Sequence, residues 1–141
     1  MPESETGVID PEENINILVA EDEEYNYLFL SEMFSGYNVT MTRAYNGKMA
    51  VDTCMENDRL HLVLMDVRMP VMDGYEAAKK IKKIRPALPV IAQTAFAMES
   101  DRKRAINEGF DDYITKPVKS DLLFDLINKY VPAPHPLKRI K

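Results

Sequence analysis

The chain has 141 residues, which suits one domain with a proper core. Its 45% hydrophobic and 29% charged residues are ordinary for a globular protein, and no apolar run approaches the roughly 20 residues that span a bilayer. The formal net charge of −5 argues against a general nucleic-acid binder. The N-terminus lacks the apolar core of a signal peptide, and the lone Cys54 has no disulfide partner in the chain. We therefore expect a cytoplasmic domain with no membrane contact and a buried Cys54.

The first part of the chain begins with an acidic stretch that we do not expect to fold. Residues 1–13 are interpreted as a disordered leader or the remnant of a linker. Residues 15–20 predict a strand that ends in an acidic run at 21–24, and a helix from about 24 to 35 follows it. Residues 39–43 alternate as a half-exposed or edge strand does. Asn46-Gly47 then opens a helix whose expected apolar stripe is Met49, Ala50, Val51, Cys54 and Met55.

The middle of the chain contains an unbroken apolar run, 62–65, that ends in a carboxylate, Asp66. Apolar residues without alternation indicate a strand buried on both faces, as in a parallel sheet covered by helices. Met69-Pro70 and Asp73-Gly74 supply turn chemistry directly after it. The next helix is predicted to bury one face and to present a solvated basic face. The buried side is Ala77, Ala78, Ile81 and Ile84, and the basic side is Lys79, Lys80, Lys82, Lys83 and Arg85.

The last third begins with a short strand at 89–93, which has Thr94 at its carboxyl end. A helix around 99–108 offers little apolar surface beyond Ala105 and Ile106, so we expect it to be the least firmly anchored. Residues 112–115 predict the fifth strand, followed by Lys116-Pro117. Ser120 is the expected N-cap of a final helix whose apolar residues are Leu122, Leu123, Leu126, Ile127 and Tyr130. Residues 132–141 are interpreted as a loose basic tail.

Five strands therefore alternate with five helices. This alternation predicts an α/β fold in which a parallel sheet has helices on both faces. We expect the flavodoxin-like (βα)5 arrangement, with five strands in the order 2-1-3-4-5.

The carboxyl ends of parallel strands meet at one edge of a sheet, so Glu21, Asp22, Asp66, Thr94 and Lys116 should gather there. Three carboxylates would repel one another unless a cation lay among them, and a hard divalent ion, Mg²⁺ before Ca²⁺, suits oxygen ligands. A metal, an ammonium and a hydroxyl are what a phosphoryl group needs for charge stabilisation. Asp66 is the expected nucleophile, because an aspartate can form an acyl phosphate.

Four motifs occur in order along the chain. They are Val19-Ala-Glu-Asp-Glu23, Leu64-Met-Asp-Val-Arg-Met-Pro-Val-Met-Asp-Gly74, Gln93-Thr-Ala95 and Asp112-Tyr-Ile-Thr-Lys-Pro117. Together they resemble the receiver domain of two-component response regulators over residues 14–131. The residues of these motifs look most like those of receivers joined to hybrid sensor histidine kinases.

The resemblance implies that Asp66 accepts a phosphoryl group from a phosphohistidine on a sensor histidine kinase or a histidine phosphotransfer domain. Asp22, Asp66 and the main-chain carbonyl of Arg68 would bind Mg²⁺. Glu21 stands where aspartate is commoner in the family, and it would help directly or through water. The domain would promote its own phosphorylation, so it is not expected to be an enzyme acting on a separate substrate.

The resemblance also assigns roles to residues of the last two strands. Thr94 would contact the phosphoryl oxygens, Lys116 would pair with the phosphate, and the Lys116–Pro117 bond would be cis. Tyr113 matches an aromatic position that changes rotamer, which would switch the surface formed by the fourth helix, the fifth strand and the last helix. Phe96, like Arg68, occupies a position that influences phosphoryl lifetime.

The first helix carries two apolar stripes, but a helix on a sheet needs only one in the core. One stripe is Tyr25, Phe29 and Met33, and the other is Tyr27, Leu30 and Phe34. We predict that part of the second stripe, Tyr27 and Leu30, is the docking surface for the phosphodonor.

Other interpretations stay open at this stage. The acids at 21–24 could simply favour a helix start, and Tyr113 could be an ordinary half-buried aromatic residue. A Mg²⁺-dependent phosphohydrolase is one rival, although Arg68 stands where such enzymes carry a second aspartate. A pseudo-receiver that only binds a partner is another, and a flavin-binding module would need a phosphate loop after the first strand. The sequence does not settle the oligomeric state.

Overall fold

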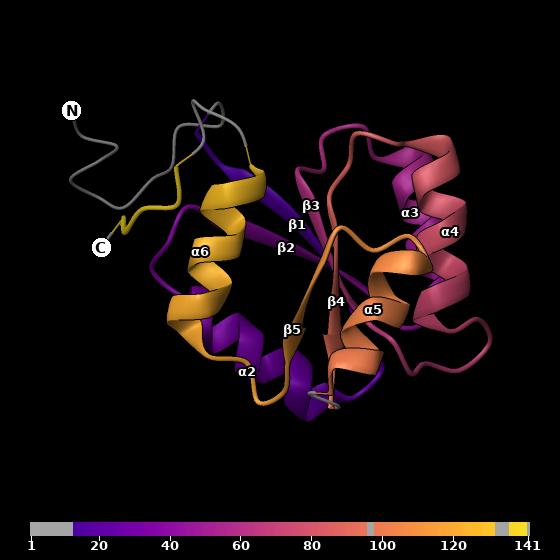
Figure 1. Ribbon diagram of the computed structural model, residues 1–141. Coiled ribbons are helices and arrows are strands. Elements are labelled where there is room, and N and C mark those ends of the chain that lie inside the picture. The colour runs from indigo at the N-terminus through magenta and orange to yellow at the C-terminus, as the bar shows by residue number, and fades with distance from the viewer. Residues whose placement is uncertain (1–12, 96–97, 132–135, 141) are drawn as a thin grey trace.

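The computed structural model describes residues 13–95, 98–131 and 136–140. Its five parallel strands form one sheet in the order β2-β1-β3-β4-β5, which confirms the flavodoxin-like arrangement (Figure 1). The strands are β1 (Ile15–Ala20), β2 (Val39–Ala44), β3 (Leu62–Asp66), β4 (Val90–Thr94) and β5 (Asp112–Thr115). The helices are α2 (Glu24–Phe34), α3 (Gly47–Glu56), α4 (Gly74–Ile84), α5 (Glu99–Asn107) and α6 (Ser120–Tyr130).

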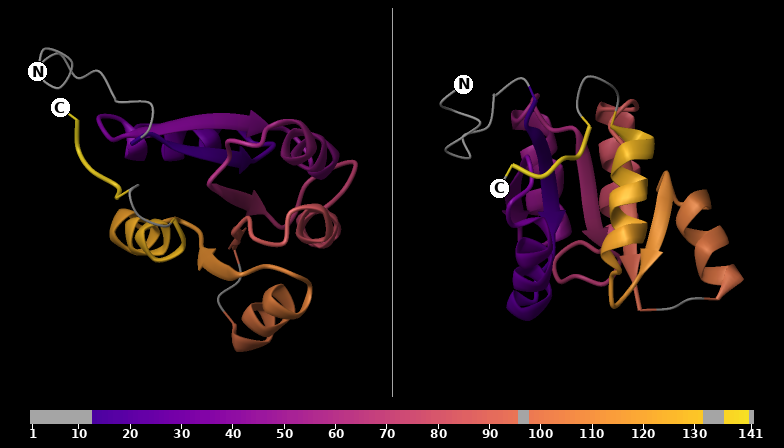
Figure 2. Two further views of the ribbon diagram at one scale, coloured as in Figure 1. Left: turned by 90° about the horizontal axis from the view of Figure 1, so that it is seen from above. Right: turned by 90° about the vertical axis from the view of Figure 1, so that its left-hand side faces the viewer.

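The helices form a layer on each face of the sheet. Helices α2 and α6 lie on one side, and α3, α4 and α5 lie on the other, as two further views make clear (Figure 2). Successive strand residues point to opposite faces, so Leu18 belongs to the core under α3, α4 and α5, whereas Ile17 belongs to the core under α2 and α6. All residues of β3 and β4 are buried, which explains why their sequences do not alternate. The edge strand β2 is only half-buried, as predicted.

The ends of the helices follow the sequence with one exception. The side chain of Asn46 accepts a hydrogen bond from the amide of Met49 at 2.8 Å and so caps α3. The expected N-cap at Ser120 is wrong, because Lys119 holds the extended N-cap conformation and Ser120 is already helical. Lys119 makes no capping hydrogen bond with its side chain, so α6 depends on packing for its start.

The apolar stripes of the helices are narrower than predicted. Each helix meets the sheet along one line, so residues one position away from that line face solvent. The predicted stripe residues that are exposed are Met49, Met55, Ile84, Ile106 and Leu122. Helix α5 buries only Ala105, which agrees with the expectation of weak anchoring, and Cys54 is buried as expected. Within the described residues, no helix has both the length and the apolar character that crossing a bilayer requires.

The basic face of α4 is not simply solvated. Lys82 Nζ donates to Asp111 Oδ2 at 2.8 Å and to the carbonyl of Leu88 at 2.9 Å. Arg85 donates to the carbonyl of Asn57 at 2.7 Å. These two cations therefore tie α4 to the loops at the amino end of the sheet.

The prediction of a loose tail is wrong for residues 136–140. The amide of Lys138 donates to Asn38 Oδ1 at 2.7 Å, and the amide of Ile140 donates to the carbonyl of Gly36 at 2.7 Å. Leu137 packs against the core under α2 and α6. This segment therefore runs along the turn that precedes β2. The rest of the predicted tail, 132–135 and 141, and residues 1–12 of the predicted leader lie outside the described residues.

Candidate functional site

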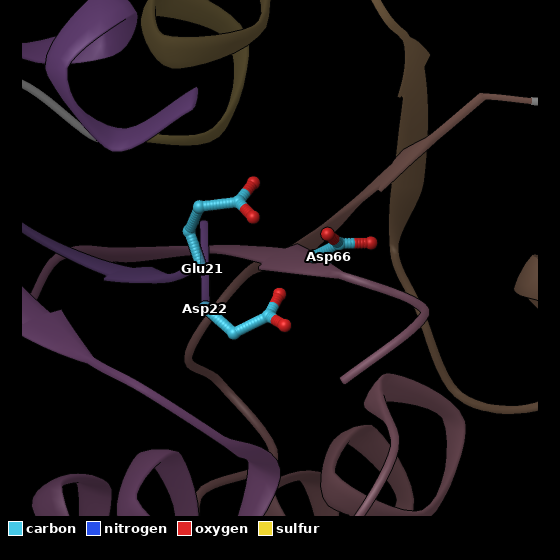
Figure 3. Close-up of side chains that lie close together, drawn as sticks. All are labelled: Glu21, Asp22 and Asp66. Carbon is cyan, nitrogen blue, oxygen red and sulfur yellow. The ribbon is translucent and has the colours of Figure 1, made fainter. Parts of the chain in front are cut away.

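Three acidic side chains meet at the carboxyl edge of the sheet. Strand β1 ends at Ala20 beside Met65 of β3, so Glu21, Asp22 and Asp66 follow two paired strands at the same height. One carboxylate oxygen from each acid lies within 4.8 Å of the others. Figure 3 shows the Glu21 and Asp22 side chains extending from adjacent positions toward the side on which Asp66 lies. The structure thus brings together the three acids that the sequence predicted.

Asp66 is held by donors on both of its oxygens. Its Oδ1 accepts a hydrogen bond from the main-chain amide of Arg68 at 3.0 Å, and its Oδ2 accepts one from Lys116 Nζ at 2.8 Å. The residue is 6% exposed, so little water competes for these contacts. Hydrogen bonds that involve a charged group are the stronger class, and two of them fix the plane of this carboxylate.

Lys116 also reaches the second buried acid. Its Nζ lies 3.2 Å from Glu21 Oε1, and the other oxygen of Glu21 accepts the amide of Glu23 at 3.2 Å. Burial raises the pKa of the Glu21 carboxyl above its ordinary value, and the charge of Asp66 raises it further against the opposing effect of Lys116. Burial alone would lower the pKa of the Lys116 ammonium, but its hydrogen bond to Asp66 and the charges of both acids raise it.

The chemistry of this cluster fits a hard divalent cation. The cluster offers only carboxylate oxygens, which Mg²⁺ prefers, and one ammonium cannot balance three negative charges. Asp22 is exposed while Glu21 is fully buried, so the site is open on the side from which a hydrated ion would enter. Glu21, Asp22 and Asp66 can therefore hold Mg²⁺.

The structure also places the predicted residues Thr94, Tyr113 and Arg68, which lie on β4, on β5 and in the loop after β3. Thr94 is buried at the end of β4, and its carbonyl accepts the amide of Lys116 at 2.8 Å. The Lys116–Pro117 peptide bond is cis, as expected. Tyr113 pairs with Ala92 in the sheet and packs, half-buried, against the core under α3, α4 and α5. The side chain of Arg68 is exposed, and Phe96 lies outside the described residues.

Two glycines bring the loop after β3 close to the site. A Cβ on Gly74 would lie 2.8 Å from the Cα of Val67, so a side chain there would displace the loop from Asp66. A Cβ on Gly47 would collide with the carbonyl of Met72 in the same way. Asp73 caps α4 by accepting the amide of Glu76 at 2.9 Å, which fixes the end of this loop. The sequence showed turn chemistry here but not these close approaches.

Arg43 is a residue of this edge that the sequence interpretation missed. It ends the alternating segment of β2 and pairs with Val19 in the sheet. Its side chain is 11% exposed, and its Nε donates to the carbonyl of Glu21 at 3.1 Å. The available signal was a basic residue near the end of a strand predicted at the edge of the sheet.

The predicted docking residues on α2 need correction. Leu30 is 1% exposed and lies in the core, so it cannot contact a partner. Tyr27 is half-buried beneath Arg43. The exposed apolar side chains of α2 are Tyr25, Leu28 and Phe29, with exposures of 78%, 54% and 42%. The prediction is wrong for Leu30, because periodicity shows that two stripes exist but not which one faces the sheet.

Comparisons with known proteins give the same family. The family model of the response regulator receiver domain matches residues 17–128. A hybrid signal transduction histidine kinase I of Dictyostelium discoideum is 34% identical over 123 residues, which cover 82% of this chain and 7% of that protein. The sensor histidine kinase RcsC of Escherichia coli is 30% identical over 130 residues, which cover 92% of this chain and 14% of that kinase. The chain thus corresponds to a small part of these two kinases.

Two solved structures share the fold at a comparable level of identity. One is the receiver domain of a Saccharomyces cerevisiae response regulator in co-crystal with a histidine phosphotransfer signaling protein, with a TM-score of 0.77, 31% identity, and 84% of this chain and 89% of that chain covered. The other is the receiver domain of a Pseudomonas aeruginosa sensor histidine kinase with magnesium in its active site cleft, with a TM-score of 0.75, 32% identity, and 83% and 97% covered. The chain belongs to the response regulator receiver domains of two-component signalling.

Proposed function

We propose that this domain is a phosphoacceptor in a phosphorelay and that Asp66 takes a phosphoryl group from a phosphohistidine. The observation that carries the proposal is the position of Asp66, which lies 2.8 Å from Lys116 inside a cluster of three acids. A buried carboxylate oriented by two donors is poised as a nucleophile, whereas a merely structural aspartate would not need two further acids beside it.

In the proposed reaction an oxygen of Asp66 attacks the phosphorus in line with the phosphorus–nitrogen bond. That bond breaks, and the imidazole leaves with the electron pair. Lys116 moves its charge from the carboxylate to the phosphoryl oxygens, and the hydroxyl of Thr94 donates a hydrogen bond to them. Asp22, Asp66 and the carbonyl of Arg68 would hold Mg²⁺, with Glu21 acting directly or through water. Mg²⁺ would supply further neutralisation of the phosphoryl charge.

Because these groups belong to the receiver itself, the domain promotes its own phosphorylation. The phosphodonor then supplies the phosphoryl group and a surface that recognises the receiver. This separates the domain from a phosphohydrolase, whose second aspartate would act as acid and base. Arg68 holds that position here, and its main-chain amide orients Asp66 instead.

The output of phosphorylation would be a changed surface on α5, β5 and α6. A phosphoryl group adds negative charge next to Thr94 and Lys116, which join β4 and β5 through one main-chain hydrogen bond of 2.8 Å. Tyr113 lies three residues before Lys116 in the chain, on the strand that the charge would shift. The single buried residue of α5, Ala105, supports the view that this helix can move at low cost.

The phosphodonor would be a sensor histidine kinase or a histidine phosphotransfer domain that docks on α2. Tyr25 and Phe29 line a small cavity of about 80 Å³ together with Lys116 and Pro117. This exposed apolar surface thus reaches the neighbourhood of the phosphoacceptor. The yeast receiver in co-crystal with a phosphotransfer protein supports this class of partner.

The central experiment is intact mass spectrometry after incubation with Mg²⁺ and acetyl phosphate. Wild type should gain one phosphoryl group only when Mg²⁺ is present, and Asp66→Asn should gain none. A folded wild-type protein that gains no phosphoryl group would contradict the proposal and favour a receiver that acts only by binding a partner.

The docking surface is tested by the double variant Tyr25→Ala/Phe29→Ala. Its phosphorylation by a cognate phosphotransfer domain should slow by about tenfold or more, because a few exposed aromatic residues carry most of the energy of such contacts. Phosphorylation by acetyl phosphate should be unchanged. A control with two exposed apolar residues away from α2, Met55→Ala/Ile84→Ala, should not affect either rate. Equal slowing with both donors would reject α2 as the docking surface.

A further inference from the structure

We propose that Arg43 is a positioning residue that sets the affinity of the acidic cluster for its divalent cation. Arg43 would do this by holding the backbone of residues 21–24, which carries two of the three acids. This inference rests on the proposed function, because it assumes that Glu21, Asp22 and Asp66 bind the cation.

The guanidinium of Arg43 joins β2 to two points of this segment. Its Nε donates to the carbonyl of Glu21 at 3.1 Å, and its Nη1 forms an ion pair with Glu24 in the first turn of α2. The side chain of Arg43 is only 11% exposed, so these contacts are protected from water, although Glu24 itself is 69% exposed. An arginine can make both contacts at once because its donors lie in one rigid plane.

Two tyrosine rings confine the same guanidinium. The Tyr27 ring centre lies 4.5 Å from Arg43 Cζ and comes from α2, whereas the Tyr45 ring centre lies 4.3 Å away and follows β2. Both distances are within the range of a cation–π interaction. The rings reduce the freedom of a side chain that would otherwise sample many rotamers, so the donor to the Glu21 carbonyl stays in place.

The carbonyl of Glu21 belongs to the peptide unit that connects Glu21 to Asp22, so a contact that holds this carbonyl also orients both residues. The amide of Glu21 already donates to the carbonyl of Ala44 at 2.9 Å. Strand β2 and its side chain thus hold both main-chain groups of Glu21 just after β1 ends. The directions in which the Glu21 and Asp22 side chains leave the backbone are thereby fixed.

This restraint matters most before the cation binds. Three carboxylates with oxygens within 4.8 Å repel one another, so a free segment would spread them apart. Arg43 keeps them close in the metal-free protein, and the cation then binds a preformed cluster. Contacts that orient metal ligands commonly change metal affinity by about 10–100-fold when they are removed.

The test is a direct calorimetric titration of the unphosphorylated full chain with Mg²⁺ at fixed pH and ionic strength. Arg43→Ala should raise the dissociation constant about tenfold, at the lower end of that range. Arg43→Lys should restore part of the affinity, because it keeps the charge but cannot donate to both partners from one plane. Tyr45→Ala should weaken binding in the same direction and less.

Arg85→Ala is the matched control. Arg85 also donates to main-chain carbonyls, those of Cys54 and Asn57, but it lies at the amino end of the sheet. The affinity of this variant for Mg²⁺ should equal that of wild type. A weakening as large as that of Arg43→Ala would overturn the inference, because the effect would then come from general loosening of the fold.

A second readout separates positioning from a defect in chemistry. In Arg43→Ala the Mg²⁺ concentration that gives half-maximal phosphorylation by acetyl phosphate should rise about tenfold, while the rate at saturating Mg²⁺ stays within about twofold of wild type. A lower saturating rate with an unchanged half-maximal concentration would overturn the positioning role.

The outcomes distinguish this inference from the proposed function. If wild type binds no Mg²⁺, the proposed metal site fails and the inference fails with it. If wild type binds Mg²⁺ and Arg43→Ala binds it equally well, only the role of Arg43 is rejected. Circular dichroism checks that each variant folds. If Arg43→Ala does not fold, Arg43→Lys decides, and an affinity equal to that of wild type overturns the inference.

Discussion

The carboxyl edge and the amino edge of the sheet differ in how their buried polar groups are paired. At the carboxyl edge, Glu21 and Asp66 are buried with a single ammonium, Lys116, and the exposed Asp22 adds a third negative charge. At the amino edge, the fully buried Asn38 has hydrogen bonds on every polar group. The first arrangement costs stability, and under the proposed function it is the site for a cation and a phosphoryl group. The second stabilises the fold and offers nothing to a ligand.

Asn38 joins three segments of the chain at one point, namely its own segment, residues 13–15 and residues 136–138. Its amide donates to the carbonyl of Lys138 at 3.1 Å, and its carbonyl accepts the amide of Ile15 at 2.8 Å. Its Nδ2 donates to the carbonyls of Glu13 at 2.8 Å and Pro136 at 3.0 Å, and its Oδ1 accepts the amide of Lys138 at 2.7 Å. A buried polar residue that is fully paired specifies one arrangement of its neighbours. The contrast teaches that the acidic cluster leaves negative charge unbalanced at the carboxyl edge, whereas the contacts of Asn38 at the amino edge are all paired.

The largest effect should come from removing the cation of the carboxyl edge. Lys116→Ala should lower the rate of phosphorylation by acetyl phosphate by about 100-fold, since loss of one preorganised donor to developing charge has that size. Rates are measured by intact mass against time at saturating Mg²⁺. Lys82→Ala, which breaks the ion pair with Asp111 at the amino edge, should leave the rate unchanged. A rate for Lys116→Ala within threefold of wild type would contradict the role of Lys116 in stabilising the transferred phosphoryl group.

The next largest effect should appear in stability alone. Asn38→Ala leaves several buried partners unpaired and should lower the free energy of unfolding by about 3 kcal/mol, measured by urea denaturation. The phosphorylation rate of the folded variant should not change. Asn128 accepts one bond, from the amide of Leu137 at 3.1 Å, and it is exposed. Asn128→Ala should therefore cost well under about 1 kcal/mol. An equal decrease in the free energy of unfolding of the two variants would show that the buried contacts of Asn38 stabilise the fold no more than one exposed hydrogen bond does.

A smaller and opposite effect is expected for Glu21→Gln in the metal-free protein. Because the pKa of Glu21 is raised in the folded state, wild type loses stability as the pH rises from about 4.5 through that raised pKa. The amide does not titrate, so the variant should become more stable than wild type as the pH rises toward 8. Urea denaturation in the presence of a chelator, repeated at several pH values, measures the difference. A difference independent of pH would show that Glu21 is not destabilised by its surroundings.

The smallest effect should come from the amino end of β5. The hydroxyl of Tyr130 donates its one hydrogen to Asp112 Oδ2 at 2.8 Å, and its oxygen lies 3.1 Å from the carbonyl oxygen of Asp111. Burial and the bond to Asp112 raise the pKa of Tyr130 to about 12, so the hydroxyl stays a donor from pH 6 to 9. Tyr130→Phe should cost about 0.5–1 kcal/mol across that range. A loss confined to one end of the range would contradict this assignment.

The sequence by itself determined where the strands lie in the chain and which acidic residues follow their carboxyl ends. Apolar runs that end at Ala20, Asp66 and Thr94 show where strands stop, and parallel strands place their carboxyl ends together. The positions of Glu21, Asp22 and Lys116 follow from this rule, because each lies within two residues of a strand end. These features are local in the chain, so they can be read without knowing which distant segments touch.

Only the tertiary structure decided the features that depend on long-range contacts. Whether Leu30 or Phe29 is exposed depends on how α2 is rotated against the sheet, which its two apolar stripes leave undetermined. The binding of residues 136–140 depends on Asn38, about 100 residues away in the chain. The contact of Arg43 with Glu21 requires that β2 lie beside β1. In each case the deciding interaction joins residues that are distant in sequence, so no local pattern could encode it.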